Sequence, residues 1–515
     1  MPRNLLTGLF QKAFKLAAEK DATTAALLQQ KQNSRRRFLK NTALLGGGIA
    51  MFPSLLKAQH LLGKKKIVIV GGGIAGLNAA YQLKKLGIAS SLYEASGRVG
   101  GRMFTLKNYF GNNLTTDLGG EFVDANHEDI LQLIKELDLE YYDLRKDTFQ
   151  KEILYFDNHP YSENDLVAAL QPYILQLVKD VASLPEELNY KNAAQFEHLD
   201  KQSIKEYLTA IGISGWLYNY LNVMLCREYG MEIEEQSALN FLIMLDKSGE
   251  FYGEHEIYKI KGGSQQLTDT IFTQVKDRVK LKHQLLAIKE KNNQYELSFS
   301  NNNKTVNIKA DYLILALPYS ILKAIKMQVA MPAEKRKCID EFGYGNSSKF
   351  IMGINNKPWR TGNKQGYTFT DENFGCGWDS AHMQSDTQGS FTVFGGGKFS
   401  DRIFESKQEQ LLQDFRPAVN KIFATADKIF TGKHIKFCWA KQPFTKAGYT
   451  SFKKGQYSSI VGWEAVPVGN IYFAGEHVSG QFQGFMNGAA ETGRKAAVQI
   501  AAAILTSNKE KNNGI

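Results

Sequence analysis

Three glycines and a following acid have the spacing that a dinucleotide site requires. Gly71, Gly73 and Gly76 fit the pattern G-x-G-x-x-G directly after the apolar run at 67–70. Their missing side chains allow a tight turn, a close approach of a pyrophosphate to the backbone, and close packing of a helix on a strand. Glu94 lies 18 residues beyond Gly76, near the roughly 20-residue spacing at which an acid binds a ribose hydroxyl. A glycine-rich turn without a ligand would not account for this acid, so the pattern predicts dinucleotide binding.

The elements that must position these residues are a strand, a helix and a second strand. The continuous apolar run at 67–70 is typical of a strand buried on both faces. Apolar residues at helical spacing from Leu77 to Leu86 predict a helix, and Gly87 is placed to end it. A second strand over 91–94 then ends in the acid. Strand, helix, strand and acid are thus in register.

Three further segments combine glycine with charge. The segment 95–102, Ala-Ser-Gly-Arg-Val-Gly-Gly-Arg, carries two arginines just after the second strand. A guanidinium group donates hydrogen bonds in a fixed fork that suits phosphate oxygens. Another glycine pair with an acid stands at 119–121, and the C-terminal part has Gly-Glu at 475–476 and Gly-Phe-Met at 484–486.

This order of motifs resembles the flavin amine oxidase family, which includes monoamine oxidases, polyamine oxidases and L-amino-acid oxidases. The resemblance runs from about Lys64 to about Ala502, nearly the whole chain after its first residues. In that family the C-terminal segment wraps the flavin end of FAD, so the resemblance implies FAD as the cofactor. The residues expected to bind it are Gly71, Gly73, Ile74, Ala75, Gly76, Glu94, Ala95, Arg98, Gly101, Arg102, Gly119, Gly120, Glu121, Val279, Gly475, Glu476, Gly484, Phe485 and Met486.

The resemblance also implies an α/β fold in which a Rossmann-like FAD-binding domain is interleaved with a mixed α+β substrate-binding domain. Roughly 457 residues after residue 58 exceed one compact core. The expected FAD-binding segments are 64–123, 258–317 and 436–503; the substrate-binding segments are 124–257, largely helical, and 318–435, which adds a sheet; and 504–515 is a polar tail.

Lys349 is the first candidate for catalysis. It stands in an apolar run, which predicts that it points inward from a strand; a lysine facing solvent at a strand edge is the alternative. In the amine oxidases a lysine in this segment, shortly before a Pro-Trp pair, holds a water against flavin N5. Here the pair is Pro358-Trp359.

Two aromatic residues are the second candidate. Tyr449 and Phe485 match, position by position, the two aromatics that flank the substrate amine in monoamine oxidases. Two ring faces orient an amine nitrogen and exclude water, with cation–π attraction while the amine is protonated. Ordinary core packing is the alternative for either ring alone.

Two departures from the family pattern limit the resemblance. Mammalian monoamine oxidases bond the flavin to a cysteine just before the first aromatic, whereas this chain has Gly448 there, so we expect FAD to be held non-covalently. No arginine can be assigned from the sequence to bind a substrate carboxylate as in amino-acid oxidases, although one from another segment of the chain would serve. The segment after Gly120 offers no basic residue.

The first 58 residues are predicted to address the protein rather than to fold with it. Ser-Arg-Arg-Arg-Phe-Leu-Lys at 34–40 resembles a twin-arginine export signal, and the glycine-containing stretch at 42–56 is too short to span a bilayer stably. We expect translocation by the twin-arginine machinery to the periplasm or cell exterior, with cleavage after Ala58. A basic patch before a buried helix is the alternative. Apolar residues from Leu6 to Ala17 have amphipathic helical spacing.

Composition argues against other classes of ligand. Through Ala58 the chain has ten Lys or Arg and two Asp or Glu, so +8 of the net charge of +11 lies there and nucleic-acid binding is not expected. Four scattered cysteines and nine dispersed histidines show no metal-ligand spacing, so we predict no metal. The oligomeric state is left open, with a homodimer as one possibility.

We therefore predict an exported FAD-dependent amine oxidase. It would oxidise an amine C–N bond to an imine, which water hydrolyses to an aldehyde or ketone, while O₂ is reduced to H₂O₂. An L-amino-acid oxidase is the first alternative. A desaturase or protoporphyrinogen-type oxidase shares the fold but should lack the lysine and the ring pair. A non-catalytic flavin-binding assembly protein would have no need of either.

Overall fold

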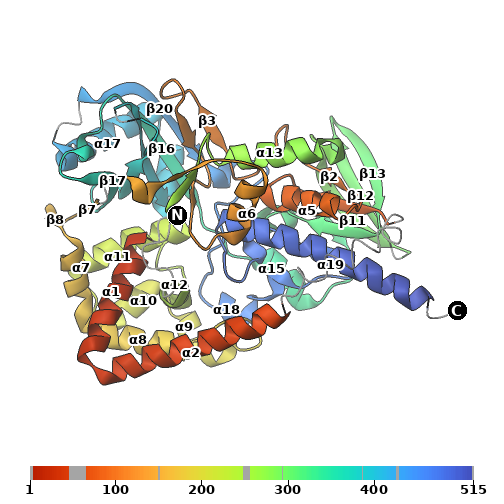
Figure 1. Cartoon of the computed structure of the whole chain (residues 1–515), viewed down its shortest axis with the longest axis horizontal. Coiled ribbons are helices and arrows are strands. Elements are labelled where there is room, and N and C mark those ends of the chain that lie inside the picture. Colours follow the sequence, from red (N-terminus) through yellow and green to blue (C-terminus); the bar gives the residue numbers. More distant parts are fainter. Residues whose placement is uncertain are drawn as a thin grey trace.

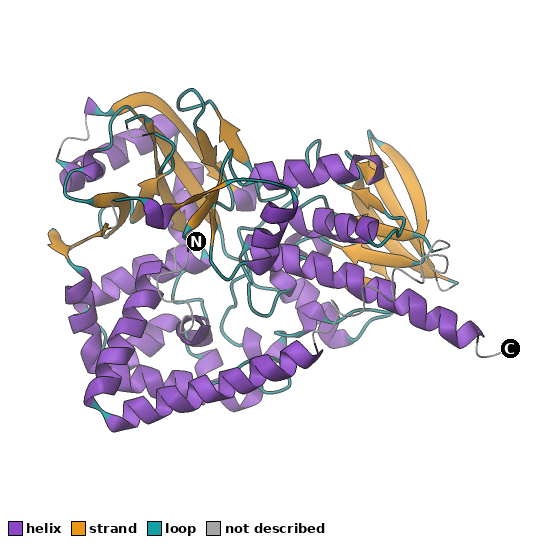
Figure 2. Ribbon diagram, in the orientation of Figure 1, coloured by secondary structure: helices purple, strands orange, loops and turns teal. Residues whose placement is uncertain are grey.

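The computed structural model of the chain describes residues 4–45, 65–148, 151–247, 256–292, 294–385, 387–424 and 428–512. A group of helices and a seven-stranded sheet occupy one side of the molecule (Figures 1 and 2). A five-stranded sheet, its covering helices and a four-stranded sheet occupy the other side. The chain passes repeatedly between the two sides, so each sheet is assembled from segments far apart in the sequence.

A five-stranded parallel sheet carries the glycine motif, in the order β10-β2-β1-β14-β21. Along β1, Ile67 and Ile69 pack into the core on the helical side, whereas Val68 and Val70 pack into the core on the opposite side. This alternation confirms the prediction of a strand buried on both faces. The strands are β1 (Ile67–Val70), β2 (Ser91–Tyr93), β10 (Val279–Lys280), β14 (Tyr312–Leu315) and β21 (Ile471–Phe473).

Helices cover one face of this sheet. The first, α5, ends as predicted: Gly87 has φ +71°, and the N–H groups of Gly87 and Ile88 donate to Lys84 O and Leu83 O. The last helix continues to Asn512 with Ile504 fully buried, so the segment expected to be a separate polar tail is the end of a helix. The four helices are α5 (Ile74–Lys85), α6 (Glu128–Glu136), α13 (Gln265–Val275) and α19 (Met486–Asn512).

The other face of the parallel sheet packs against a four-stranded sheet, in the order β13-β12-β11-β15. Its strand β15 pairs with β11 although it lies beyond residue 317, where we expected the middle FAD-binding segment to end. The elements are β11 (Gln284–Lys291), β12 (Gln294–Asn301), β13 (Lys304–Ala310), α14 (Tyr319–Leu322), β15 (Lys326–Gln328) and α15 (Ala333–Glu341).

A seven-stranded sheet on the opposite side has the order β20-β16-β19-β18-β17-β7-β8. Every residue of β16 is buried, and Lys349 pairs there between Phe394 and Phe437. Helices α16 and α17 lie against the sheet. The elements are β7 (Lys151–Phe156), β8 (His159–Tyr161), β16 (Ser347–Ile354), β17 (Lys364–Thr370), β18 (Cys376–Asp379), β19 (Gly389–Gly396), α16 (Gly397–Glu405), α17 (Gln408–Phe423) and β20 (Phe430–Cys438).

Two small sheets connect these parts. A three-stranded sheet has the order β5-β9-β6, and β3 pairs with β4. The strands are β3 (Thr105–Lys107), β4 (Thr115–Asp117), β5 (Phe122–Val123), β6 (Tyr141–Asp143) and β9 (Tyr258–Ile260).

The helical group includes two N-terminal helices that we expected to lie outside the fold. In α1, Phe10 and Phe14 are buried in the same apolar core as Phe241. The twin-arginine sequence at 34–40 forms part of helix α2. The group comprises α1 (Asn4–Lys20), α2 (Ala22–Leu45), α7 (Glu163–Leu170), α8 (Ile174–Ser183), α9 (Glu197–Lys201), α10 (Ile204–Ala210), α11 (Gly215–Tyr229), α12 (Ala238–Lys247) and α18 (Gln456–Ser459).

Part of the expected export signal falls outside the described residues. The predicted cleavage point after Ala58 lies there, as does the apolar stretch from residue 46 onward. Of the helices that the structure describes, none has both the length and the hydropathy needed to cross a bilayer.

Gly76 provides a test of the glycine turn. A Cβ there would lie 1.9 Å from Gly71 O, so Gly76→Val should overpack the turn and destabilise the protein by about 1–3 kcal/mol. We expect a lower Tm. Gly97→Ala is the matched control, because a Cβ there meets only Lys282 Cε at 3.8 Å. Equal Tm values for the two variants would contradict this account of the turn.

Candidate active site

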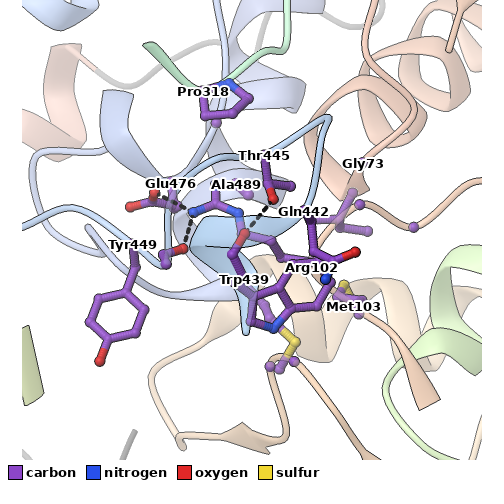
Figure 3. Close-up of a pocket in the computed structure, with 18 of the residues that line it drawn as sticks. Gly73, Arg102, Met103, Pro318, Trp439, Gln442, Thr445, Tyr449, Glu476 and Ala489 are labelled. Atoms are coloured by element: carbon purple, nitrogen blue, oxygen red, sulfur yellow. Dashed lines mark hydrogen bonds and ion pairs between the residues drawn. The ribbon is translucent and has the colours of Figure 1, made fainter. Parts of the chain in front are cut away.

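A cavity of about 330 Å³ lies where the glycine turn, the seven-stranded sheet and the C-terminal segment meet. Figure 3 shows Gly73 on one side of it and Tyr449 and Glu476 on the other. Most of the predicted residues line it: Gly71, Gly73, Ile74, Ala75, Glu94, Arg98, Gly101, Arg102, Gly119, Gly120, Glu121, Lys349, Tyr449, Gly475, Glu476, Gly484, Phe485 and Met486.

Three predicted residues do not line the cavity. Gly76 lies under the turn against Gly71, Val279 pairs with Leu92 at the edge of the sheet, and Ala95 only precedes the lining residue Ser96. Their neighbourhood was predicted from the motif, but a motif does not say which way each residue faces.

The glycine turn is shaped for a ligand that runs along the backbone. Gly71 has φ +108°, and a Cβ there would lie 2.4 Å from Ala316 O, so a side chain does not fit. By contrast, a Cβ on Gly73 would meet nothing closer than Gly101 Cα at 3.9 Å, which leaves open space beside the turn. Glu94 accepts hydrogen bonds from Gly72 N (2.6 Å) and Ser96 N (2.8 Å), so its carboxylate is held at the mouth of the turn.

The two predicted phosphate arginines have different surroundings. The Arg98 guanidinium donates to Val99 O (2.9 Å) and Gly101 O (2.6 Å) and lies 4.3 Å from the Phe104 ring, so it stiffens its own loop. Arg102 instead reaches the C-terminal segment.

Glu476 joins the segments that carry the two predicted aromatics. Arg102 Nη1 donates to Glu476 Oε1 (2.9 Å) and to Gly448 O (2.6 Å), as drawn in Figure 3. The other carboxylate oxygen, Oε2, accepts from Thr450 Oγ1 and Gly484 N, both at 2.7 Å. Burial raises the pKa of Glu476, but Arg102 and the hydrogen bonds outweigh it, and the pKa lies below its ordinary value. Glu476 thus fixes the backbone next to Tyr449 and Phe485 by staying ionised.

A second buried carboxylate, Glu121, lies between two lysines. Its oxygens accept from Lys259 Nζ (2.7 Å) and Lys349 Nζ (2.9 Å), and Trp378 Nε1 donates to both at 3.2 Å. Burial alone would raise the pKa of Glu121. The two ammonium groups outweigh this effect and lower the pKa to about 2. Glu121 was expected to bind the cofactor; its observed partners are these two lysines and Trp378.

Lys349 points inward, as predicted. Its Nζ donates to Asp117 O (2.7 Å), Gly119 O (3.1 Å) and Glu121 Oε2 (2.9 Å), so each of its three donors has an acceptor. Lys349 therefore ties β16 to the turn after β4. To hold a water, it must exchange one of these three contacts.

The aromatic candidates both lie on the cavity wall and are buried. The Tyr449 hydroxyl donates to Arg227 O at 2.6 Å, which fixes the ring plane. The Phe485 ring lies 5.2 Å from His127. Trp439, Trp378 and Phe394 also line the cavity and add apolar surface to its wall. Sequence reasoning missed these three residues, since no local pattern distinguishes them from core aromatics.

Arg227, on α11, also lines the cavity and was missed. Its guanidinium is 1% exposed and lies 5.4–5.7 Å from four rings. Nη2 donates to the Tyr367 hydroxyl (2.7 Å), whereas Nε and Nη1 have no hydrogen-bond partner among the described residues. The sequence around it has no motif that would reveal it. The four rings are Tyr367, Phe369, Trp378 and Phe394.

Residues 74–501 match the model of the flavin containing amine oxidoreductase family. The flavin-containing amine oxidase B of Bos taurus is 28% identical over 464 residues, covering 85% of this chain and 86% of that protein. A putative L-amino-acid oxidase of Bacillus subtilis (strain 168) is 22% identical over 472 residues, covering 87% and 96%. Cyclohexylamine oxidase from Brevibacterium oxydans IH-35A has the same fold, with a TM-score of 0.75 at 20% identity over 85% of this chain and 99% of that one.

The chain therefore belongs to the flavin containing amine oxidoreductase family and is an FAD-dependent oxidoreductase. The predicted fold class and cofactor are confirmed. The residues of the cavity also fit FAD, independently of the relatives. Gly73 leaves room for a pyrophosphate, and Glu94 stands at the ribose position of the motif. The described residues contain no cluster of His, Cys, Asp or Glu suited to a metal ion.

Replacing Glu121 tests the buried network. Glu121→Gln leaves two buried lysines without their carboxylate, which should cost about 3–5 kcal/mol at neutral pH. The pKa of Glu121 falls from 4.5 to about 2 on folding. The wild type therefore exceeds Glu121→Gln in free energy of unfolding by the full amount above pH 4.5, and this difference disappears as the pH falls toward 2. Urea unfolding of both proteins across this pH range measures it. A difference independent of pH would contradict the ionised network.

Proposed function

We propose that this chain is an exported oxidase of amines. It would oxidise an amine C–N bond to an imine, which water hydrolyses to an aldehyde or ketone and ammonia or a smaller amine. O₂ would accept the electrons and form H₂O₂. The observation that carries this proposal is the cavity in which Tyr449, Phe485 and Lys349 lie together in an FAD-binding fold.

The aromatic walls suit an amine. Tyr449 and Phe485 present buried rings to the cavity, and their backbones are fixed through Glu476. Such walls exclude water and attract an ammonium group through their π faces. Once the amine has lost its proton, the shape of the cavity would hold it between the two rings.

The charged groups act around this apolar region. FAD, when bound, supplies the two-electron oxidation. Lys349 is held by Glu121 and by two carbonyl oxygens, so it places one fixed positive charge at the floor of the cavity. A water that replaces one of these acceptors would be oriented by the ammonium group.

FAD is held non-covalently in this proposal. Position 448 is a glycine, where a Cβ would lie 2.8 Å from Ser347 Oγ and 2.9 Å from Gly345 O. A cysteine therefore would not fit there without a shift of the backbone. None of the four cysteines lines the cavity.

One observation favours an L-amino-acid oxidase as the second candidate. Arg227 brings a buried guanidinium to the cavity wall, and its Nε and Nη1 have no hydrogen-bond partner among the described residues. A substrate carboxylate would accept hydrogen bonds from these two donors. The rings that cover the guanidinium, including Trp378 and Phe394, would have to move to admit it. The amine proposal needs no such movement.

We also propose that the protein acts outside the cytoplasm. The twin-arginine sequence at 34–40 supports export of a folded, cofactor-loaded protein by the twin-arginine machinery, to the periplasm or cell exterior. Fractionation of cells that produce the wild-type chain or an Arg35→Lys/Arg36→Lys/Arg37→Lys variant tests it.

Anaerobic titration of the flavin spectrum tests the activity. We expect primary amines, polyamines or N-methylated amines to bleach the spectrum, with H₂O₂ formed when air is admitted. Bleaching by L-amino acids alone would establish the second candidate, and Arg227→Gln should then abolish it. A flavin that no amine or amino acid bleaches would refute both and favour the desaturase-like or non-catalytic alternatives.

Lys349→Met tests the role of the buried lysine. The protein should remain folded and yellow, while flavin reduction or reoxidation slows by about 10²-fold or more, as for loss of a positioned proton-transfer group. Stopped-flow absorbance separates the two half-reactions. Lys364→Met, on β17 of the same sheet but outside the cavity lining, is the control. Unchanged rates in Lys349→Met would remove Lys349 from the mechanism.

A further inference from the structure

Lys259, on β9, is a buried cation that the proposed function leaves without a role. Its side chain is 5% exposed, and it is not among the described residues that line the flavin cavity. Its Nζ donates to Glu121 Oε1 (2.7 Å) and to Ser380 O (2.8 Å). Lysines are rarely buried unless they are paired, so Glu121 stabilises this charge.

Glu121 holds its two ammonium partners on separate oxygens. Lys259 donates to Oε1, and Lys349 donates to Oε2 at 2.9 Å. Trp378 Nε1 donates to both oxygens at 3.2 Å. If Lys349 turns away, Glu121 therefore keeps one ammonium group and the indole N–H. Either lysine alone prevents it from becoming an unpaired buried carboxylate, which would be strongly destabilising.

Lys349 can release Glu121 without leaving that acceptor unsatisfied. Its two other acceptors, Asp117 O and Gly119 O, are backbone carbonyl oxygens that anchor the ammonium group at the cavity. The carboxylate of Asp117 has partners of its own, because it accepts from Thr105 Oγ1 (2.6 Å) and Ser264 N (3.0 Å). Glu121 is the acceptor of Lys349 that has a second cation.

We propose that Lys259 is a positioning residue for Lys349. By holding Glu121, it lets Lys349 turn one N–H from the carboxylate to a ligand in the cavity. Without Lys259, Lys349 would be the sole ammonium partner of Glu121 and would stay bound to it.

The proposal rests on the proposed function, in which O₂ reoxidises the cofactor. O₂ takes up two electrons and two protons from reduced FAD and leaves as H₂O₂, and FAD returns to its oxidised form. Negative charge develops on oxygen as the electrons arrive, and a free ammonium N–H of Lys349 stabilises it. Loss of Lys259 should therefore slow this step although Lys259 does not line the cavity.

A stability cycle with the flavin-loaded full chain tests the shared pairing without measuring activity. Lys259→Met and Lys349→Met each leave Glu121 with one ammonium group, whereas the double variant leaves it with none. We expect the double variant to lose more Tm than the two single losses together, by about 2 °C or more. This excess should vanish when Glu121→Gln is added to every variant. Repulsion between the two lysines would instead leave the excess in place.

Reoxidation of flavin that dithionite has reduced tests the consequence and needs no amine substrate. Lys259→Met should slow reoxidation by O₂ about tenfold or more. Lys259→Arg should reoxidise at close to the wild-type rate, because it keeps a cation on Glu121. Lys261→Met is the matched control, since Lys261 follows β9, is 41% exposed and lies 3.4 Å from Glu140 Oε2. Lys259→Gln replaces Lys259→Met if the latter does not accumulate.

Four outcomes would overturn the proposal: an additive cycle, an excess that survives Glu121→Gln, wild-type reoxidation in Lys259→Met or in Lys349→Met, and equal slowing in Lys259→Met and Lys261→Met. If the double variant does not accumulate, the reoxidation rates of the single variants decide. Failure of every amine to bleach the flavin would refute the proposed function instead, and would leave both of these measurements possible.

Discussion

The ionised carboxylate of Glu476 is the interaction on which the arrangement of the site depends. One of its oxygens binds Arg102 from the loop after β2, and the other accepts from Thr450 and Gly484, each next in sequence to a cavity aromatic. A single buried charge therefore joins the loop after β2 to two C-terminal segments that follow it by more than 340 residues. Such a group needs a fixed cation, because a buried carboxylate left unpaired is strongly destabilising.

Glu121 plays the complementary role between the two sides of the molecule. It receives Lys349 from the seven-stranded sheet and Lys259 from β9, while its own backbone continues the glycine pair of the flavin-binding side. Of the two buried carboxylates, Glu476 thus fixes the segments that carry the aromatic walls. Glu121 joins the seven-stranded sheet to the flavin-binding side. The protein contributes position and fixed charge, and the cofactor contributes the redox chemistry.

The parts that could be predicted from the sequence are those whose cause is local. The strand–glycine–helix unit follows from apolar runs and from turns that tolerate no Cβ, so Gly71, Gly73 and the cap at Gly87 were readable. The inward direction of Lys349 followed from its apolar neighbours. The contacts between distant residues could not be predicted from the sequence. No spacing links Glu121 to Lys259, and nothing near Arg227 indicates that it lines the cavity. The amphipathic pattern of the N-terminal helix was visible, but its docking on α12 depends on a surface formed far along the chain.

The most direct test of the account is whether the purified protein holds FAD, and how. Precipitation with acid, followed by chromatography of the supernatant, separates released flavin from flavin bonded to the chain. We expect one equivalent of FAD per chain, all of it in the supernatant. No flavin even after reconstitution with FAD would contradict the assignment of the cavity, and flavin that stays with the precipitate would contradict its non-covalent binding.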